Sequence, residues 1–100
     1  MHLNFNGEVI HWRGPAPHYF VRVPESESDA IRAIAKLVSY GWGVIPVCAK
    51  IGESEWFTSL FPKDGAYLVP IRAIIKHAEA LEAGQIVYIS LDVGRRKPAA

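Results

Sequence analysis

Apolar and polar residues alternate along several segments of the chain, as they do in a half-buried β-strand. The alternation predicts strands near both ends of the chain, over Leu3–Trp12, His18–Val23 and Gln85–Val93. Each of these strands gathers apolar residues on one face, for example Leu3, Phe5 and Val9 in the first and Tyr19, Val21 and Val23 in the second. One side of each strand is therefore expected to face a core.

Three further strands are expected in the middle of the chain, over residues 44–51, 54–61 and 66–69. Gly52-Glu53 has the composition of a tight hairpin turn between the first two. Pro62–Gly65 is a turn of the Pro-x-Asp-Gly kind. Pro46 indicates an edge strand or a bulge, because proline has no N–H to donate to a neighbouring strand.

Two segments have apolar residues at positions i, i+3, i+4 and i+7, which is typical of one face of a helix. They are Ile31, Ile34, Ala35 and Val38 in the first segment and Ile71, Ile74, Ile75 and Ala78 in the second. Ser26 and Asp29 resemble a capping box at the start of the first helix. Glycines are expected to end both helices, Gly41 and Gly43 after the first and Gly84 after the second.

The order β-β-α-β therefore occurs twice, with pseudo-repeats over about residues 3–51 and 52–93. Val23-Pro24 and Val69-Pro70 both end a strand and lead into a helix. One such half cannot bury its own apolar face, whereas two halves can close around one core and leave no exposed strand edge. We expect a mainly β fold with two short helices, a small closed barrel in a single domain over residues 1–94, and a disordered tail at 95–100.

Composition narrows the class of protein without naming a partner. Half of the 100 residues are hydrophobic, which is enough for a core without disulfides or metal. The formal net charge of +1 is not the strongly basic balance of most nucleic-acid-binding proteins. No signal peptide is visible, and no apolar run approaches the ~20 residues that span a bilayer. We therefore expect a cytoplasmic protein that does not bind membranes.

The sequence carries no signature of catalysis or of metal binding. Cys48 lies in an apolar β-rich run, so a buried and inert thiol is expected. The four histidines lack the spacing of a zinc site and are interpreted as ordinary surface residues: His2, His11, His18 and His77. No GxGxxG, GxxxxGK[ST] or GxSxG motif is present. Neither an enzyme nor a cofactor is expected.

Four segments form a recognisable set: Trp42–Val47, Trp56–Pro62, Gly65–Ile71 and Glu82–Val87. Together they resemble a bacterial family of unknown function, DUF1905. The resemblance covers roughly Phe5 to Val93 and implies a double-split β-barrel, similar in layout to the barrels that AbrB-like and MazE-like transcription factors build from two chains. Such domains are often followed by a YdeI/OmpD-associated domain. The resemblance implies no activity that could be assigned residue by residue.

The aromatic residues near strand ends suggest a binding surface. Large rings in these places either fill a small barrel or surround the mouth of a ligand site. The hypothesis of a binding or interaction module, for a small molecule or a protein, assigns the ligand to Trp42, Trp56, Tyr67 and Arg72. A monomer or a weak homodimer is expected.

Two alternatives remain open. By analogy with AbrB-like barrels, the domain could be a nucleic-acid-binding regulator. Its contacts would then come from Arg13, Arg22, Arg72, Arg95, Arg96 and Lys97. In the second alternative the domain is a scaffold for a partner domain of the YdeI/OmpD-associated type.

Overall fold

The computed structural model describes residues 1–14, 18–38 and 45–98, with six strands and two helices. In chain order these are β1 His2–Trp12, β2 His18–Arg22, α1 Glu25–Val38, β3 Ile45–Ile51, β4 Ser54–Lys63, β5 Ala66–Ile71, α2 Ala73–Ala78 and β6 Ile86–Val93. The expected order of elements is confirmed. The expected helix-ending residues Gly41 and Gly43 lie outside the described residues.

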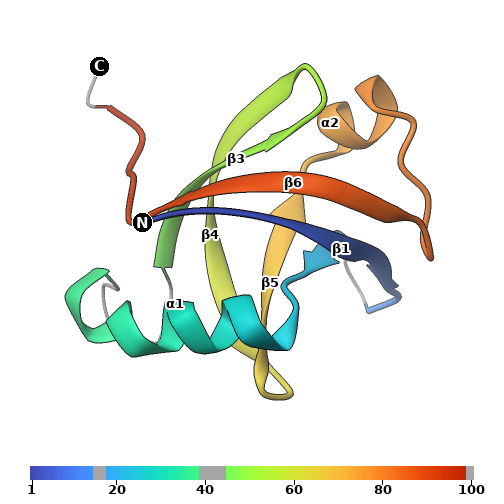
Figure 1. Ribbon diagram of the computed structural model, residues 1–100. Helices are drawn as coiled ribbons and strands as arrows, with labels where there is room; N and C mark the ends of the chain where they lie inside the picture. The colour runs from blue at the N-terminus through green and yellow to red at the C-terminus, as the bar shows by residue number, and fades with distance from the viewer. Residues whose placement is uncertain (15–17, 39–44, 99–100) are drawn as a thin grey trace.

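The six strands form one closed antiparallel barrel in the order β1-β2-β5-β4-β3-β6 (Figure 1). The two longest strands each change partner along their length. β1 pairs with β6 over His2–Glu8 and with β2 over Glu8–Trp12. β4 pairs with β3 over Ser54–Leu60 and with β5 over Phe61–Lys63. This is a double-split layout, and the expected fold class is confirmed.

The pairing of the strands is symmetric. Exchanging β1, β2 and β3 with β4, β5 and β6 leaves the set of neighbouring strands unchanged. This symmetry is what two β-β-α-β halves around one core require. That the halves also repeat in sequence stays a prediction.

The barrel interior is filled by the apolar faces that the alternation predicted. In β1, Phe5 and Val9 are buried, and in β6 the buried residues alternate with exposed Ile86 and Tyr88. The core cluster draws on every strand and includes Val21, Val47, Leu60, Val69 and Ile89. Because each strand turns one face inward, its opposite face lies outside the barrel.

Closure of the barrel removes the edge that Pro46 suggested. β3 lies between β4 and β6, and Pro46 is buried. The ladder with β6 runs from Val47 to Lys50, so the missing N–H of Pro46 falls at its end. Its carbonyl still accepts a bond from the Gly94 N–H at 2.7 Å. The interpretation as an edge strand was wrong, because proline is also tolerated where a ladder stops.

A buried serine fastens helix α1 to the start of β5. The helix begins at Glu25, so Ser26 lies in the first turn and the expected capping box is wrong. Ser28 is fully buried, where its hydroxyl donates to the Val23 carbonyl at 3.1 Å and accepts from the Tyr67 N–H at 3.2 Å. Both buried backbone groups are thereby satisfied.

Helix α2 is shorter than expected and presents a different face. It spans only six residues and begins at Ala73. Ile71, which was expected on the helix, is the last residue of β5. Ile75 is buried, but Ile74 is 73% exposed. The helix ends with Glu79 as its C-cap, well before Gly84. A spacing of i, i+3 across a strand–helix boundary does not define one helix face.

The two helices lie at opposite ends of β4. Arg32 of α1 donates to the carbonyl of Gly65, in the turn that follows β4. Glu79, directly after α2, accepts a bond from the Ser54 hydroxyl at the start of β4. The end of the barrel beside α2 also receives the start of β2, since Tyr19 pairs with Ile71.

Candidate functional site

Trp56 and Arg72 bridge the split between β4 and β5. The ladder between these strands stops at Leu68, so the backbone beyond it has no partner strand on that side. The Trp56 indole N–H donates to the Pro70 carbonyl at 3.0 Å, and the Arg72 guanidinium donates to the Phe57 carbonyl at 3.2 Å. Because Trp56 is only 5% exposed, its ring closes the split rather than offering a binding face.

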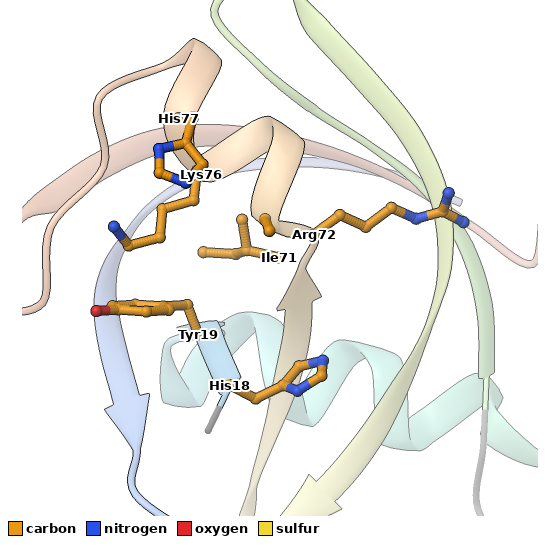
Figure 2. A pocket seen from close by; sticks show the side chains of 7 residues that line it. His18, Tyr19, Ile71, Arg72, Lys76 and His77 are labelled. Atoms are coloured by element: carbon orange, nitrogen blue, oxygen red, sulfur yellow. The ribbon is translucent and has the colours of Figure 1, made fainter. Parts of the chain in front are cut away.

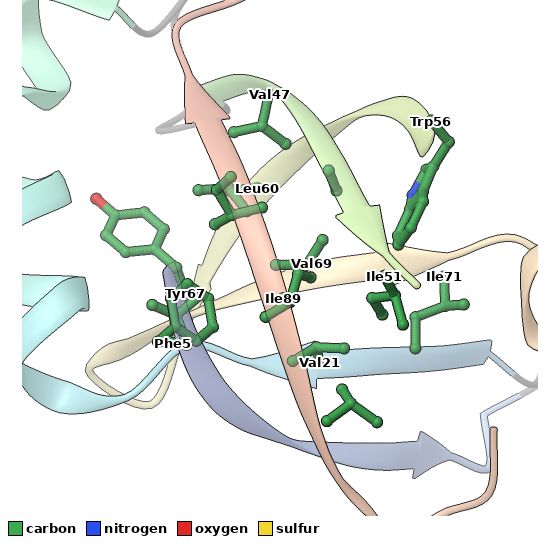
Figure 3. Packing of buried hydrophobic residues seen from close by; sticks show 14 of the residues in the cluster. Phe5, Val21, Val47, Ile51, Trp56, Leu60, Tyr67, Val69, Ile71 and Ile89 are labelled. Atoms are coloured by element: carbon green, nitrogen blue, oxygen red, sulfur yellow. The ribbon is translucent and has the colours of Figure 1, made fainter. Parts of the chain in front are cut away.

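Tyr67 is buried at the other end of the core, as Figure 3 shows. Its backbone N–H is held by Ser28, and the Arg32 guanidinium carbon lies 6.0 Å from its ring centre. Trp42 lies outside the described residues. The structure therefore does not bring Trp56, Tyr67 and Arg72 together on one surface. The rings of Trp56 and Tyr67 instead fill the barrel, which is the other role that large rings near strand ends can have.

The six basic residues of the nucleic-acid alternative are distributed over the molecule. Arg13 follows β1, whereas His2 at the other end of β1 pairs with Asp92. The whole length of β1 therefore separates Arg13 from Arg95, Arg96 and Lys97. Arg95 forms an ion pair with Asp92 at 3.7 Å.

Arg22 does not share a basic surface with these residues either. It lines a cavity together with three carboxylates, those of Glu25, Asp29 and Asp64. Acidic groups of this kind repel a phosphate backbone. The set as a whole does not form one continuous footprint on duplex DNA.

A cavity of about 280 Å³ opens at the end of the barrel beside α2. We call it the mouth pocket. It is lined by His18, Tyr19, Ile71, Arg72, Ala73, Lys76 and His77 (Figure 2). The Lys76 Nζ lies 4.6 Å from the centre of the Tyr19 ring, and the His11 ring stacks on the same tyrosine at 4.4 Å.

The charge of the mouth pocket is one-sided. Among the described residues that line it, the ionisable groups apart from the tyrosine hydroxyl are basic, and none is a carboxylate. Glu79, the acidic residue that follows α2, is bonded to the Ser54 hydroxyl at 2.6 Å. The Arg72 guanidinium points away from Lys76 toward β4, so Arg72 contributes its aliphatic stem (Figure 2).

Sequence reasoning missed the mouth pocket because its residues come from three elements. His18 and His77 were interpreted as ordinary surface histidines. The spacing of Arg72 and Lys76, four residues apart around a predicted helix, was the available signal of a basic face. The contact between Lys76 and Tyr19 depends on the pairing of β2 with β5, which the local sequence pattern does not indicate.

A second cavity, of about 460 Å³, lies on the outside of the barrel, beside the hairpin that β1 forms with β2. We call it the outer-face pocket. It is lined by Ile10, His11, Trp12, Arg13, Lys63 and Leu68. The Lys63 Nζ lies 4.0 Å from the centre of the Trp12 ring, and Trp12 is 45% exposed. The described part of this lining also lacks a carboxylate.

A family model described as a domain of unknown function, DUF1905, matches residues 5–91. The chain belongs to the DUF1905 family. No curated protein matches it. The match runs from β1 into β6, so both pockets beside the β1–β2 hairpin are built from the DUF1905 domain itself.

The thiol of this DUF1905 domain is on the outer side of β3. Cys48 is buried and lines a cavity of about 290 Å³ with Glu55, Asp92 and Arg95 among its neighbours. Desolvation by burial raises the pKa of the Cys48 thiol, and the nearby Glu55 carboxylate raises it further. The thiol therefore stays protonated at neutral pH, which disfavours its use as a nucleophile.

The described residues of this DUF1905 domain contain neither a group of metal-ligating side chains nor a membrane-spanning helix. Over residues 1–14, 18–38 and 45–98, no three side chains of the metal-ligating kinds are grouped closely enough to hold an ion. In the same ranges, no helix is both long and apolar enough to span a membrane.

Proposed function

We propose that this DUF1905 domain is a binding module for a small organic anion, which it holds in the mouth pocket. The observation that carries the proposal is the Lys76 ammonium, held over the face of Tyr19 in a cavity whose described lining has no acidic group. An ammonium in such a place attracts a carboxylate or a phosphate, and charge-assisted hydrogen bonds are among the strongest polar contacts.

The rest of the lining favours a ligand that also has an apolar part. Ile71 and Ala73 supply an apolar floor beside the Tyr19 ring. His18 and His77 lie on other sides of the cavity, where each ring can donate an N–H (Figure 2). A few polar groups around an apolar surface is the usual composition of a small-molecule site.

The lining supports binding rather than covalent chemistry. The described lining includes no serine, threonine or cysteine that could act as a nucleophile, and neither of its histidines has a carboxylate partner there. Nucleophilic catalysis needs such a pair within hydrogen-bond reach. We therefore propose no reaction for this pocket.

The test is an NMR titration of amide signals with benzoate, inorganic phosphate and, as a neutral match for benzoate, benzyl alcohol. We expect benzoate to shift the amides of His18, Tyr19 and Lys76, because the anion meets the ammonium while the ring meets the apolar floor. Benzyl alcohol is expected to bind more weakly, since it lacks the charge.

Lys76→Gln is the deciding variant, because it keeps most of the length of the side chain and removes its charge. Removing a charge-assisted hydrogen bond costs about 1.5–3 kcal/mol, so benzoate affinity should fall by about tenfold or more. Lys50→Gln, at an exposed lysine on β3, is the matched control and should leave binding unchanged. Equal affinity of the wild type and Lys76→Gln for benzoate would refute the proposal.

A further inference from the structure

A second apolar cluster lies outside the barrel core, on the faces of β1, β2, β4 and β5 that point away from it. Phe20 and Leu68 are 5% and 1% exposed, yet neither belongs to the core cluster inside the barrel. Phe20 packs edge-on against Phe61 at 5.3 Å and lies 6.4 Å from the Trp12 ring. These rings cover one another and support the outer-face pocket from below.

Trp12 is the exposed member of this cluster, and basic groups surround it. Trp12 is 45% exposed as a residue, although its neighbours Phe20 and Leu68 are buried. Arg13 and Lys63 line the same pocket, together with His11. The pocket thus combines a supported aromatic ring with two permanent positive charges, and no described residue of its lining is a carboxylate.

We propose that the outer-face pocket binds single-stranded nucleic acid, with one base stacked on Trp12 and the adjoining phosphates held by Arg13 and Lys63. Aromatic side chains on which bases stack, bordered by cations that follow the backbone, are the usual means of binding single strands. The proposal concerns a different surface from the mouth pocket and does not depend on it.

The observations favour a single strand over a duplex. A base can reach the Trp12 ring only when it is not stacked in a helix. A duplex would instead need a long basic footprint, and the described arginines of this chain do not provide one, since Arg22 lies among carboxylates and Arg95 is paired with Asp92.

Lys63 lies over the Trp12 ring, and a base must displace it to stack there. Its ammonium is 4.0 Å from the ring centre, and a cation–π contact at a residue as exposed as Trp12 is weak. Stacking of a base is the stronger contact. A base can therefore replace the ammonium, which is then beside the phosphate of the same nucleotide.

The test follows the indole N–H signals while a ten-nucleotide oligothymidylate is added. We expect the Trp12 indole signal to shift. The Trp56 signal is the internal control, because its N–H is bonded to the Pro70 carbonyl inside the split and should not move. A 20-base-pair duplex and a polyglutamate peptide, titrated in the same way, should bind more weakly than the oligonucleotide.

Variants separate stacking from charge. Trp12→Ala should weaken oligonucleotide binding about tenfold. Arg13→Gln, at an exposed side chain outside the buried cluster, should reduce the slope of log Kd against log salt by about 0.7, because one phosphate is no longer neutralised. Lys50→Gln should leave affinity and slope unchanged.

Three results would overturn the proposal. They are an unmoved Trp12 indole signal at low salt, a salt slope that is the same in wild type and Arg13→Gln, and binding of polyglutamate as tight as that of the oligonucleotide. The last result would assign the pocket to an acidic protein partner instead. Lys76→Gln should leave the affinity for the oligonucleotide unchanged, so this test is independent of the mouth pocket.

Discussion

At the scale of single residues, the direction of a side chain decides its role, and residues of the same type differ in this respect. Trp56 and Trp12 both lie in long strands that change partner. Trp56 is turned into the split, where its indole satisfies the Pro70 carbonyl, whereas Trp12 is on the outside of the barrel. One ring therefore stabilises the fold, and the other is available to a ligand.

Trp56→Phe tests the structural role of the first ring. The phenyl ring fills most of the space but cannot donate to the Pro70 carbonyl. Without that bond and with a smaller ring, we expect the free energy of unfolding to fall by about 1–3 kcal/mol. Urea unfolding measures the change, and Trp12→Phe is the control, with an expected change within about 0.5 kcal/mol. An equal loss in both variants would contradict the assignment.

At the scale of elements, alternation was a sufficient guide to the strands and an insufficient guide to α2. The period of two shows which face of β1 and β6 is buried, because each of these strands turns one side into the core. The spacing of Ile71 and Ile75 imitates a helix, although Ile71 ends β5. A six-residue helix has too few turns for periodicity to fix its boundaries.

Paired isoleucine variants test the observed orientation of α2. Ile74 is 73% exposed and Ile75 is buried, although the spacing predicted one shared buried face. Ile75→Ala should lower the free energy of unfolding by about 2 kcal/mol or more, and Ile74→Ala by less than about 0.5 kcal/mol. Thermal or urea unfolding distinguishes them, and similar losses would favour the face that the sequence predicted.

The candidate sites were less predictable than the fold for a related reason. Trp56 and Arg72 are close in space, as the sequence hypothesis required, but their polar atoms are used by backbone carbonyls of Pro70 and Phe57. The mouth pocket instead depends on the register that pairs Tyr19 with Ile71. Local patterns identify strands, while long-range register decides which side chains meet.

At the scale of the whole molecule, closure makes the barrel depend on the places where its long strands change partner. Gly7 lies next to Glu8, where β1 leaves β6 and joins β2. A Cβ at position 7 would lie 2.6 Å from Val21 Cγ1 and 2.7 Å from the Arg22 carbonyl oxygen. Because Gly7 has no side chain, β2 can approach β1 closely enough to close the barrel.

Gly7→Ala should consequently disturb the closure of the whole barrel and not only one contact. The Arg22 carbonyl is backbone and cannot rotate away, so β1 and β2 must separate, at an expected cost of about 2–4 kcal/mol. Gly84→Ala is the control: its φ of 91° is strained for alanine but its surroundings are open, so about 1 kcal/mol is expected. In hydrogen exchange, Gly7→Ala should lower protection in β2 and also in β5, because β5 is the next strand around the ring. If protection is lost only at Gly7 and its neighbours in β1, the β1–β2 pairing adjusts locally and closure of the barrel is not cooperative.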